Sequence, residues 1–133
     1  MEPTASIEIS VVAPAYNEEG NLPEFARRVL ETFGIGQLAG ELVLVDDGST
    51  DGTGRVIREL EKQYPGVIVG RFQGRNRGIA EAWRTGVSAA RGVLVCLIDS
   101  DLQYQPEDIL RLRRTLVEHS VDVVQGWRSV IRR

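Results

Sequence analysis

The chain has 133 residues and a formal net charge of −3, with 42% hydrophobic and 26% charged residues, which is the ordinary composition of one soluble globular domain. It holds no apolar run of the roughly 18 residues that a membrane-spanning helix needs, no secretory signal, and no positive charge excess of the kind that bulk nucleic-acid binding needs. Its single cysteine, Cys96, excludes an internal disulfide and fits a reducing, cytoplasmic compartment. We therefore expect one domain over residues 1–133, with no nucleic acid as a partner.

Segments with strand-like and helix-like patterns alternate along the chain. Apolar, largely β-branched runs predict five strands, over residues 7–14, 42–45, 67–69, 93–98 and 121–124. Apolar residues at helical spacing predict four helices, one between each pair of successive strands. Asn21 with Glu24 predicts a capping box for the first helix, and Pro23 suits its first turn. The run at 93–98 is the most continuous, which predicts a central position in the sheet.

Alternation of strands and helices is typical of βαβ units. It predicts an α/β fold, in which a mainly parallel sheet of about five strands has helices on both faces. In such a sheet, ligands bind beyond the carboxyl ends of the strands, where the connections diverge. The candidate functional residues are therefore those in the loops that follow Pro14, Val45, Ile98 and Val124.

Asp99, Ser100 and Asp101 follow the most apolar of these runs. Two carboxylates so close together at the mouth of a sheet repel each other when both are ionised, and a divalent cation removes that cost. Mg²⁺ commonly takes one or two carboxylates together with substrate phosphates and water, and Gln103 offers a further neutral oxygen. The pattern favours a metal–phosphate site; the alternative is a turn whose aspartates cap the helix that begins near Pro106.

A second acidic loop, residues 46–51, follows the second predicted strand. Ser49, Thr50 or Asp51 can cap the next helix, but capping does not account for the whole cluster. Asp46 or Asp47 can accept hydrogen bonds from ribose hydroxyls or from a nucleobase, as acidic residues do in other nucleotide-binding sheets. We expect structural and ligand roles to be shared in this loop.

Aromatic and basic residues follow the other strands. Tyr16 can stack on a base and Glu18 can accept a hydrogen bond from it, although Tyr16 can equally be a packed loop residue. Arg75 and Arg77 precede the third helix, where guanidinium groups and free helix N–H groups favour a diphosphate; the alternative is that they are solvated surface arginines. Arg128 lies just past the fifth predicted strand, within reach of a phosphate.

Charge is unevenly divided along the chain. Residues 1–66 hold 5 basic and 12 acidic residues, whereas residues 67–133 hold 11 basic and 7 acidic residues. This division favours a site that binds an anion together with a cation, although a chance distribution of surface charge would look the same.

Three motifs resemble, in order and spacing, the family 2 glycosyltransferases, and among them the polyprenyl-phosphate sugar transferases such as dolichyl-phosphate mannose synthase. They are Pro-Ala-Tyr-Asn-Glu at 14–18, Val-Asp-Asp-Gly-Ser-Thr-Asp-Gly-Thr at 45–53 and Asp-Ser-Asp-Leu-Gln at 99–103. Ser100 is a small departure, because alanine is frequent at that position in the subgroup. A larger departure is that the family's catalytic domains continue with an acceptor-binding half, so we expect this chain to be an N-terminal, donor-binding part.

The resemblance implies a nucleotide-diphospho-sugar transferase fold (GT-A, Rossmann-like), apparently truncated. It also implies transfer of a sugar, with inversion, from GDP-mannose or a UDP-sugar to a dolichyl or undecaprenyl phosphate. The implied cofactor is Mg²⁺ or Mn²⁺, held by Asp99, Asp101 and Gln103, with the two aspartates as the catalytic residues. Arg75 and Arg128 would contact phosphate. The residues implied for the nucleotide are Pro14, Tyr16, Glu18, Val45 and Asp47, and we add Asp46 and Ser100 as further candidates.

Other classes fit the sequence less well. A dinucleotide-dependent dehydrogenase needs a glycine fingerprint that residues 15–20 do not supply, and a haloacid-dehalogenase-like phosphatase or a phospho-receiver domain needs a later lysine, whereas the only lysine is Lys62. The strongest alternative is a non-catalytic nucleotide-sugar-binding fragment, or a subunit whose acceptor site is completed by a second copy or a partner chain. A polyprenyl-phosphate acceptor would bring the chain into peripheral contact with the cytoplasmic membrane face.

Overall fold

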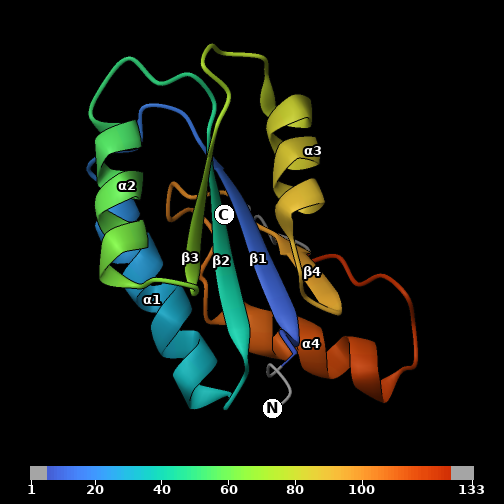
Figure 1. The fold of residues 1–133 in the computed structure, drawn as a ribbon. Helices are drawn as coiled ribbons and strands as arrows, with labels where there is room; N and C mark the ends of the chain where they lie inside the picture. Colours follow the sequence, from blue (N-terminus) through green and yellow to red (C-terminus); the bar gives the residue numbers. More distant parts are fainter. Residues whose placement is uncertain (1–5, 127–133) are drawn as a thin grey trace, which may run out of the picture.

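The computed structural model of the protein describes residues 6–126 and contains one four-stranded parallel sheet (Figure 1). Its strands are β1 (Ile9–Ala15), β2 (Gly40–Asp46), β3 (Ile68–Phe72) and β4 (Leu94–Leu97), in the order β3-β2-β1-β4. Its helices are α1 (Leu22–Ile35), α2 (Thr53–Gln63), α3 (Ile79–Ala89) and α4 (Asp108–Glu118). The α/β class expected from the alternating patterns is confirmed.

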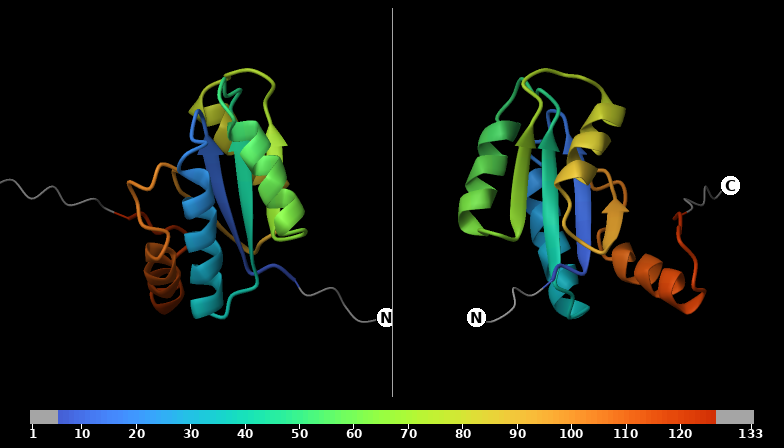
Figure 2. Two further views of the ribbon diagram at one scale, coloured as in Figure 1. Left: turned by 90° about the vertical axis from the view of Figure 1, so that its left-hand side faces the viewer. Right: turned by 45° about the vertical axis from the view of Figure 1, so that its right-hand side comes forward.

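Helices cover both faces of the sheet, with α1 and α2 on one side and α3 on the other (Figure 2). Side chains of successive strand residues point to opposite faces, and β1 supplies both cores in this way. Val11 and Ala13 pack in the cluster that contains α1 and α2, whereas Val12 packs with Ala82 of α3. Both faces of β1 are therefore buried, which explains its continuous apolar sequence.

The strand order reverses at β1. The chain steps outward from β1 to β2 to β3, and α3 then crosses over β1 and β2 to place β4 on the other side of β1. The connections after β1 and after β4 consequently diverge, which leaves a crevice at their carboxyl ends. The topology puts the expected ligand site between these two strands.

Two predictions about the strands are wrong. Residues 121–124 form no strand, and Val123 is 81% exposed, because this segment follows α4 without forming hydrogen bonds to β4 in the part of the chain that is described. The run at 93–98 is not central either: within residues 6–126, β4 lies at the edge of the sheet, with Val95 44% and Leu97 52% exposed. A continuous apolar run indicates that a segment tends to be buried. It does not specify which strands or helices bury it, and so it does not specify the position of the strand in the sheet.

The predicted capping box of α1 is also wrong. Asn21 occupies the N-cap position but makes no side-chain hydrogen bond to the helix; its Nδ2 instead donates to Glu18 Oε2 at 2.8 Å. Glu24 accepts two hydrogen bonds from Arg27. Pro23 lies in the first turn, as expected.

A buried carboxylate ties the amino ends of the strands to the segment that leads into β4. Glu41 of β2 is fully buried and accepts hydrogen bonds from Ser10 Oγ at 2.6 Å, from Arg91 N at 2.6 Å and from Arg91 Nε at 3.0 Å. Burial alone would raise the pKa of Glu41, but the hydrogen bonds from Ser10 and Arg91 and the charge of Arg91 outweigh it and lower the pKa. Ser10 Oγ also accepts from Gly92 N at 2.7 Å. This network fixes the position at which β4 begins.

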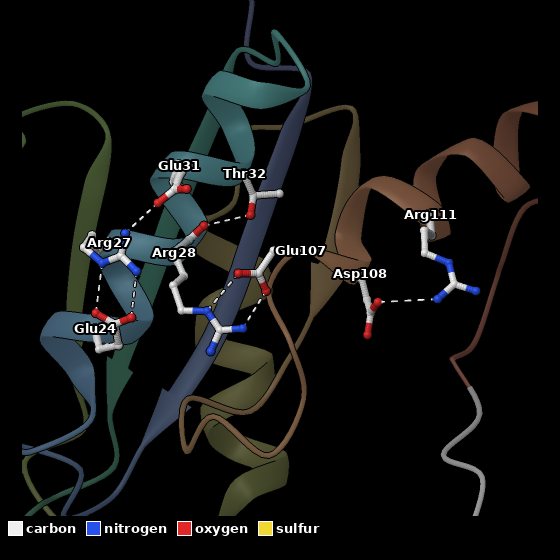
Figure 3. A network of polar contacts seen from close by, with 8 residues as sticks. All are labelled: Glu24, Arg27, Arg28, Glu31, Thr32, Glu107, Asp108 and Arg111. Atoms are coloured by element: carbon white, nitrogen blue, oxygen red, sulfur yellow. Dashed lines mark hydrogen bonds and ion pairs between the residues drawn. The ribbon is translucent and has the colours of Figure 1, made fainter.

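Helix α4 is held to the rest of the molecule by few contacts. Ile109 is its only buried residue, and Arg28 of α1 forms a two-pronged ion pair with Glu107 at its N-terminus, with distances of 2.9 and 2.6 Å (Figure 3). Hydrogen bonding to Glu107 raises the pKa of Arg28, and hydrogen bonding to Arg28 lowers that of Glu107. The ion pair orients the loop that carries the acidic motif.

Candidate functional site

A cleft of about 160 Å³ lies at the carboxyl ends of β1 and β4, where the strand order reverses. The last two residues of β1, residues from the loops after β1, β2 and β4, and the first residue of α3 line it. They are Pro14, Ala15, Tyr16, Glu18, Asp47, Ile79, Asp99, Ser100 and Asp101. The structure thus brings together most of the nucleotide-binding and metal-binding residues proposed from the sequence.

The register of the strands explains how these loops meet. Ala15 of β1 is opposite Asp46 of β2, so the loops that follow the two strands start at the same level. β4 pairs with β1 only as far as Leu97, opposite Val12. The acidic loop therefore begins earlier and runs alongside the end of β1.

Ser100 anchors this acidic loop. Its side chain is buried, 2% exposed, and Ser100 Oγ donates to the Pro14 carbonyl oxygen at 2.8 Å. Asp101 Oδ1 accepts from Gln103 N at 3.0 Å, and Leu102 between them has a φ of 66°. The loop consequently turns back on itself directly after Asp101.

The two carboxylates of the loop have the electrostatics of a cation site. Burial raises the pKa of Asp99, and the negative charge of Asp101 raises it further. Within residues 6–126 no group of three or more His, Cys, Asp or Glu side chains could hold a metal ion by itself. Two carboxylates whose negative charges repel each other fit a Mg²⁺ or Mn²⁺ ion that takes its other ligands from phosphate and water. Gln103 belongs to the same loop but is not among the residues that line the cleft.

The two adjacent aspartates after β2 have different positions. Asp46 is 9% exposed, and its Oδ1 accepts from Ser49 N at 3.0 Å, so it stabilises the turn of its own loop. Asp47 lines the cleft, and its Oδ1 accepts from Arg77 N at 2.9 Å. Of the two, Asp47 is the one whose side chain can meet a ligand in the cleft.

Val45 is completely buried in the core beneath α3 and does not line the cleft. Tyr16, by contrast, is 46% exposed and lines the cleft. Glu18 lines the cleft through its half-buried side chain, and its N–H donates to Thr53 Oγ1 at 2.9 Å. The partly exposed ring of Tyr16 and the carboxylate of Glu18 suit the nucleoside role proposed from the sequence.

The loop between β3 and α3 lies against the loop after β2. Gly48 has a φ of 70°, and a Cβ atom there would collide with the backbone of Arg75 and Asn76; only glycine fits this approach. The Arg75 side chain is exposed and does not line the cleft. Arg128 lies outside the described residues.

Two residues were not assigned a role from the sequence. Ile79, the first residue of α3, is 56% exposed and lines the cleft. Asn17 links the loops after β1 and β2. Two features of the sequence could have indicated that these residues belong to the site. Ile79 lies at the start of a helix, and Asn17 lies between two candidate site residues.

The fold and the cleft together define a class. A parallel sheet with a pair of carboxylates where the strand order reverses is the architecture of the GT-A nucleotide-sugar transferases. A solved structure of this class is similar to the present chain. The mannosyltransferase PcManGT from Pyrobaculum calidifontis, in complex with GDP-Man and Mn²⁺, has a TM-score of 0.67 and 29% identity, covering 82% of this chain and 32% of that protein. The family is established from the sequence: residues 10–133 match glycosyl transferase family 2, and the chain belongs to that family.

Named relatives are polyprenyl-phosphate sugar transferases. The dodecaprenyl-phosphate galacturonate synthase of Rhizobium johnstonii is 34% identical over 96% of this chain and 38% of its own length. The undecaprenyl-phosphate 4-deoxy-4-formamido-L-arabinose transferase of Aeromonas hydrophila is 42% identical over 90% of this chain and 36% of its own length. The chain therefore spans less than two fifths of these relatives. Among residues 6–126 no helix is long and apolar enough to cross a membrane.

Proposed function

We propose that the chain binds a nucleotide-diphosphate sugar, GDP-mannose or a UDP-sugar, and supplies the donor side of a sugar transfer to a polyprenyl phosphate. The observation that carries this proposal is the cleft itself. It places Tyr16, Glu18 and Asp47 beside Asp99 and Asp101, in a chain of glycosyl transferase family 2.

The nucleoside end of the donor is assigned to the side of the cleft formed by the loops after β1 and β2. The exposed ring of Tyr16 offers a stacking surface for a base. Glu18 and Asp47 offer carboxylate oxygens to ring N–H groups or ribose hydroxyls. One oxygen of Asp47 already accepts from Arg77 N, which leaves the other oxygen of that carboxylate for the ligand.

The diphosphate end is assigned to the acidic loop. Asp99 and Asp101 would hold Mg²⁺ or Mn²⁺, with Gln103 as a further oxygen donor, and the arginines Arg75 and Arg128 would approach the phosphates. The raised pKa of Asp99 supports this assignment, because a cation relieves the burial and repulsion that oppose its ionisation. Such a cation acts as a Lewis acid that stabilises negative charge on the departing nucleotide.

The acceptor is assigned from the relatives, whose names specify polyprenyl phosphates. A phosphate oxygen is already anionic, so its attack on the anomeric carbon needs no strong general base. Attack opposite to the leaving diphosphate inverts the configuration of that carbon. From this acceptor we propose that the reaction takes place at the cytoplasmic face of the membrane.

A second candidate is a chain that binds the donor and needs a partner for transfer. It rests on the lining of the cleft, in which no described residue is assigned to the acceptor. Both candidates bind the donor in the same cleft. They differ in whether the chain catalyses the sugar transfer without a partner.

A transfer assay separates the two candidates. The chain is incubated with Mn²⁺, a short-chain polyprenyl phosphate in detergent and radiolabelled GDP-mannose or UDP-sugars, and label in the lipid extract is measured. A labelled lipid of inverted anomeric configuration, lost in Asp99→Asn, supports the transferase. Donor binding without lipid product supports the subunit, and a product of retained configuration contradicts the proposed mechanism.

A further inference from the structure

Asn17, between Tyr16 and Glu18 in the loop after β1, is exposed but makes four hydrogen bonds to one other loop. Asn17 Oδ1 accepts from Thr50 N at 2.9 Å, from Thr50 Oγ1 at 3.3 Å and from Asp51 N at 3.3 Å. Asn17 N donates to Ser49 Oγ at 3.0 Å. All four bonds reach the loop after β2, more than thirty residues away in the sequence.

The backbone of Asn17 suits this role. Its φ of 54° lies in the left-handed region, which asparagine tolerates better than most residues that have a side chain. This conformation turns the Asn17 side chain toward the loop after β2, whereas its neighbours Tyr16 and Glu18 line the cleft. The side chain is exposed and takes no part in either apolar core.

The acidic loop is anchored without Asn17. Ser100 Oγ binds the carbonyl oxygen of Pro14, which precedes Asn17 in the chain. The cleft therefore has two separately anchored sides. The nucleoside side is held by hydrogen bonds between the segments after β1 and β2, made by Asn17 and by Glu18 N to Thr53 Oγ1. The metal side is fixed to the end of β1.

We propose that Asn17 is a positioning residue for the nucleoside. It locks the loop that carries Tyr16 and Glu18 onto the loop that begins with Asp47, so that the three side chains present one surface. This inference rests on the proposed donor-binding function. It requires Asn17 to affect recognition of the nucleoside and to leave recognition of metal and phosphate unchanged.

The test compares two ligands on the same variants. Calorimetric titration, with Mn²⁺ present throughout, measures the affinity for GDP or UDP, whichever the wild type binds more tightly, and for inorganic pyrophosphate. Asn17→Ala loses three accepted hydrogen bonds, so we expect nucleotide affinity to fall about tenfold or more and pyrophosphate affinity to stay within about twofold. Asn17→Asp keeps both the acceptor oxygen and the tolerance for positive φ, so it should restore most of the nucleotide affinity.

Gln37 provides a matched control, because it is an exposed residue with a φ of 51° at the end of α1. Gln37→Ala introduces alanine into the same kind of backbone conformation, and we expect it to change neither affinity. Equal losses for both ligands in Asn17→Ala, no loss for either, or failure of Asn17→Asp to recover would overturn the role of Asn17. A wild type that binds neither ligand would overturn the proposed function, and the role of Asn17 with it.

Discussion

Ser100 illustrates how a residue between two candidate metal-binding carboxylates can have a structural role. Its hydroxyl is buried and donates to Pro14 O at 2.8 Å, so it joins the acidic loop to β1. Asp99 and Asp101 on either side remain directed to the cleft. The contact shows why the motif alternates, with one small residue held inward between two acidic residues.

Replacing Ser100 by alanine should cost stability more than it costs binding. Ser100→Ala removes one buried hydrogen bond, for which we expect a loss of about 1 kcal/mol in the free energy of unfolding. The nucleotide affinity should change by less than about threefold, because both carboxylates remain. Urea unfolding and calorimetry measure the two quantities.

Ser88 of α3 is an exposed serine and provides the control for that measurement. Ser88→Ala should leave both stability and affinity unchanged. A Ser100→Ala variant as stable as the wild type, but with affinity lost, would mean that the Ser100 hydroxyl contacts the ligand directly.

At the level of elements, β4 depends on the buried network at its amino end. Glu41 joins β1 through Ser10 and joins the segment before β4 through Arg91. Since β4 carries the acidic loop, this network contributes to the geometry of a site at the opposite end of the sheet. Helix α4 adds a second, weaker constraint through Arg28 and Glu107.

The network predicts a specific dependence of stability on pH. Because the pKa of Glu41 is lowered in the folded state, its ionised form stabilises the fold at neutral pH. That contribution should be fully present above the unfolded pKa of about 4.5 and should be lost as the pH falls below it, through the lowered folded value. At pH 7, the free energy of unfolding of Glu41→Gln should be about 1–3 kcal/mol lower than that of the wild type. On acidification, this free energy should fall less in the variant than in the wild type.

Urea unfolding between pH 7 and pH 3 checks this behaviour. Glu24→Gln is the control, since Glu24 forms an exposed ion pair within α1 and such pairs contribute little to stability. A Glu41→Gln variant with the stability and acid sensitivity of the wild type would show that the network is not stabilising.

The sequence predicts much of the whole molecule. Alternating periodicity predicts the α/β class and the parallel sheet, and the buried runs that become β1 and β2 are located to within a few residues. The topological rule also predicts that a cleft lies at the carboxyl ends of the strands, where the structure has one. Those inferences succeed because they depend on local patterns and on general constraints of chain connection.

The failures concern interactions between distant residues. The strand expected at residues 121–124 and the central position expected for residues 93–98 both depended on pairing partners, which apolar content does not specify. The links made by Glu41 and Asn17 join residues 31 to 50 positions apart. Local propensity contains no information about such contacts, so only the folded arrangement reveals them.

Metal-dependent nucleotide binding at the acidic loop tests the central claim most directly. Thermal shift with GDP and UDP, each with and without Mn²⁺, should show stabilisation by one nucleotide when Mn²⁺ is present, of roughly 2.7 kcal/mol at a hundredfold its dissociation constant. Asp101→Ala should abolish that stabilisation, whereas Asp108→Ala, which removes an exposed aspartate of α4, should retain it. No stabilisation by either nucleotide, or equal stabilisation in Asp101→Ala, would contradict the assignment of the donor site.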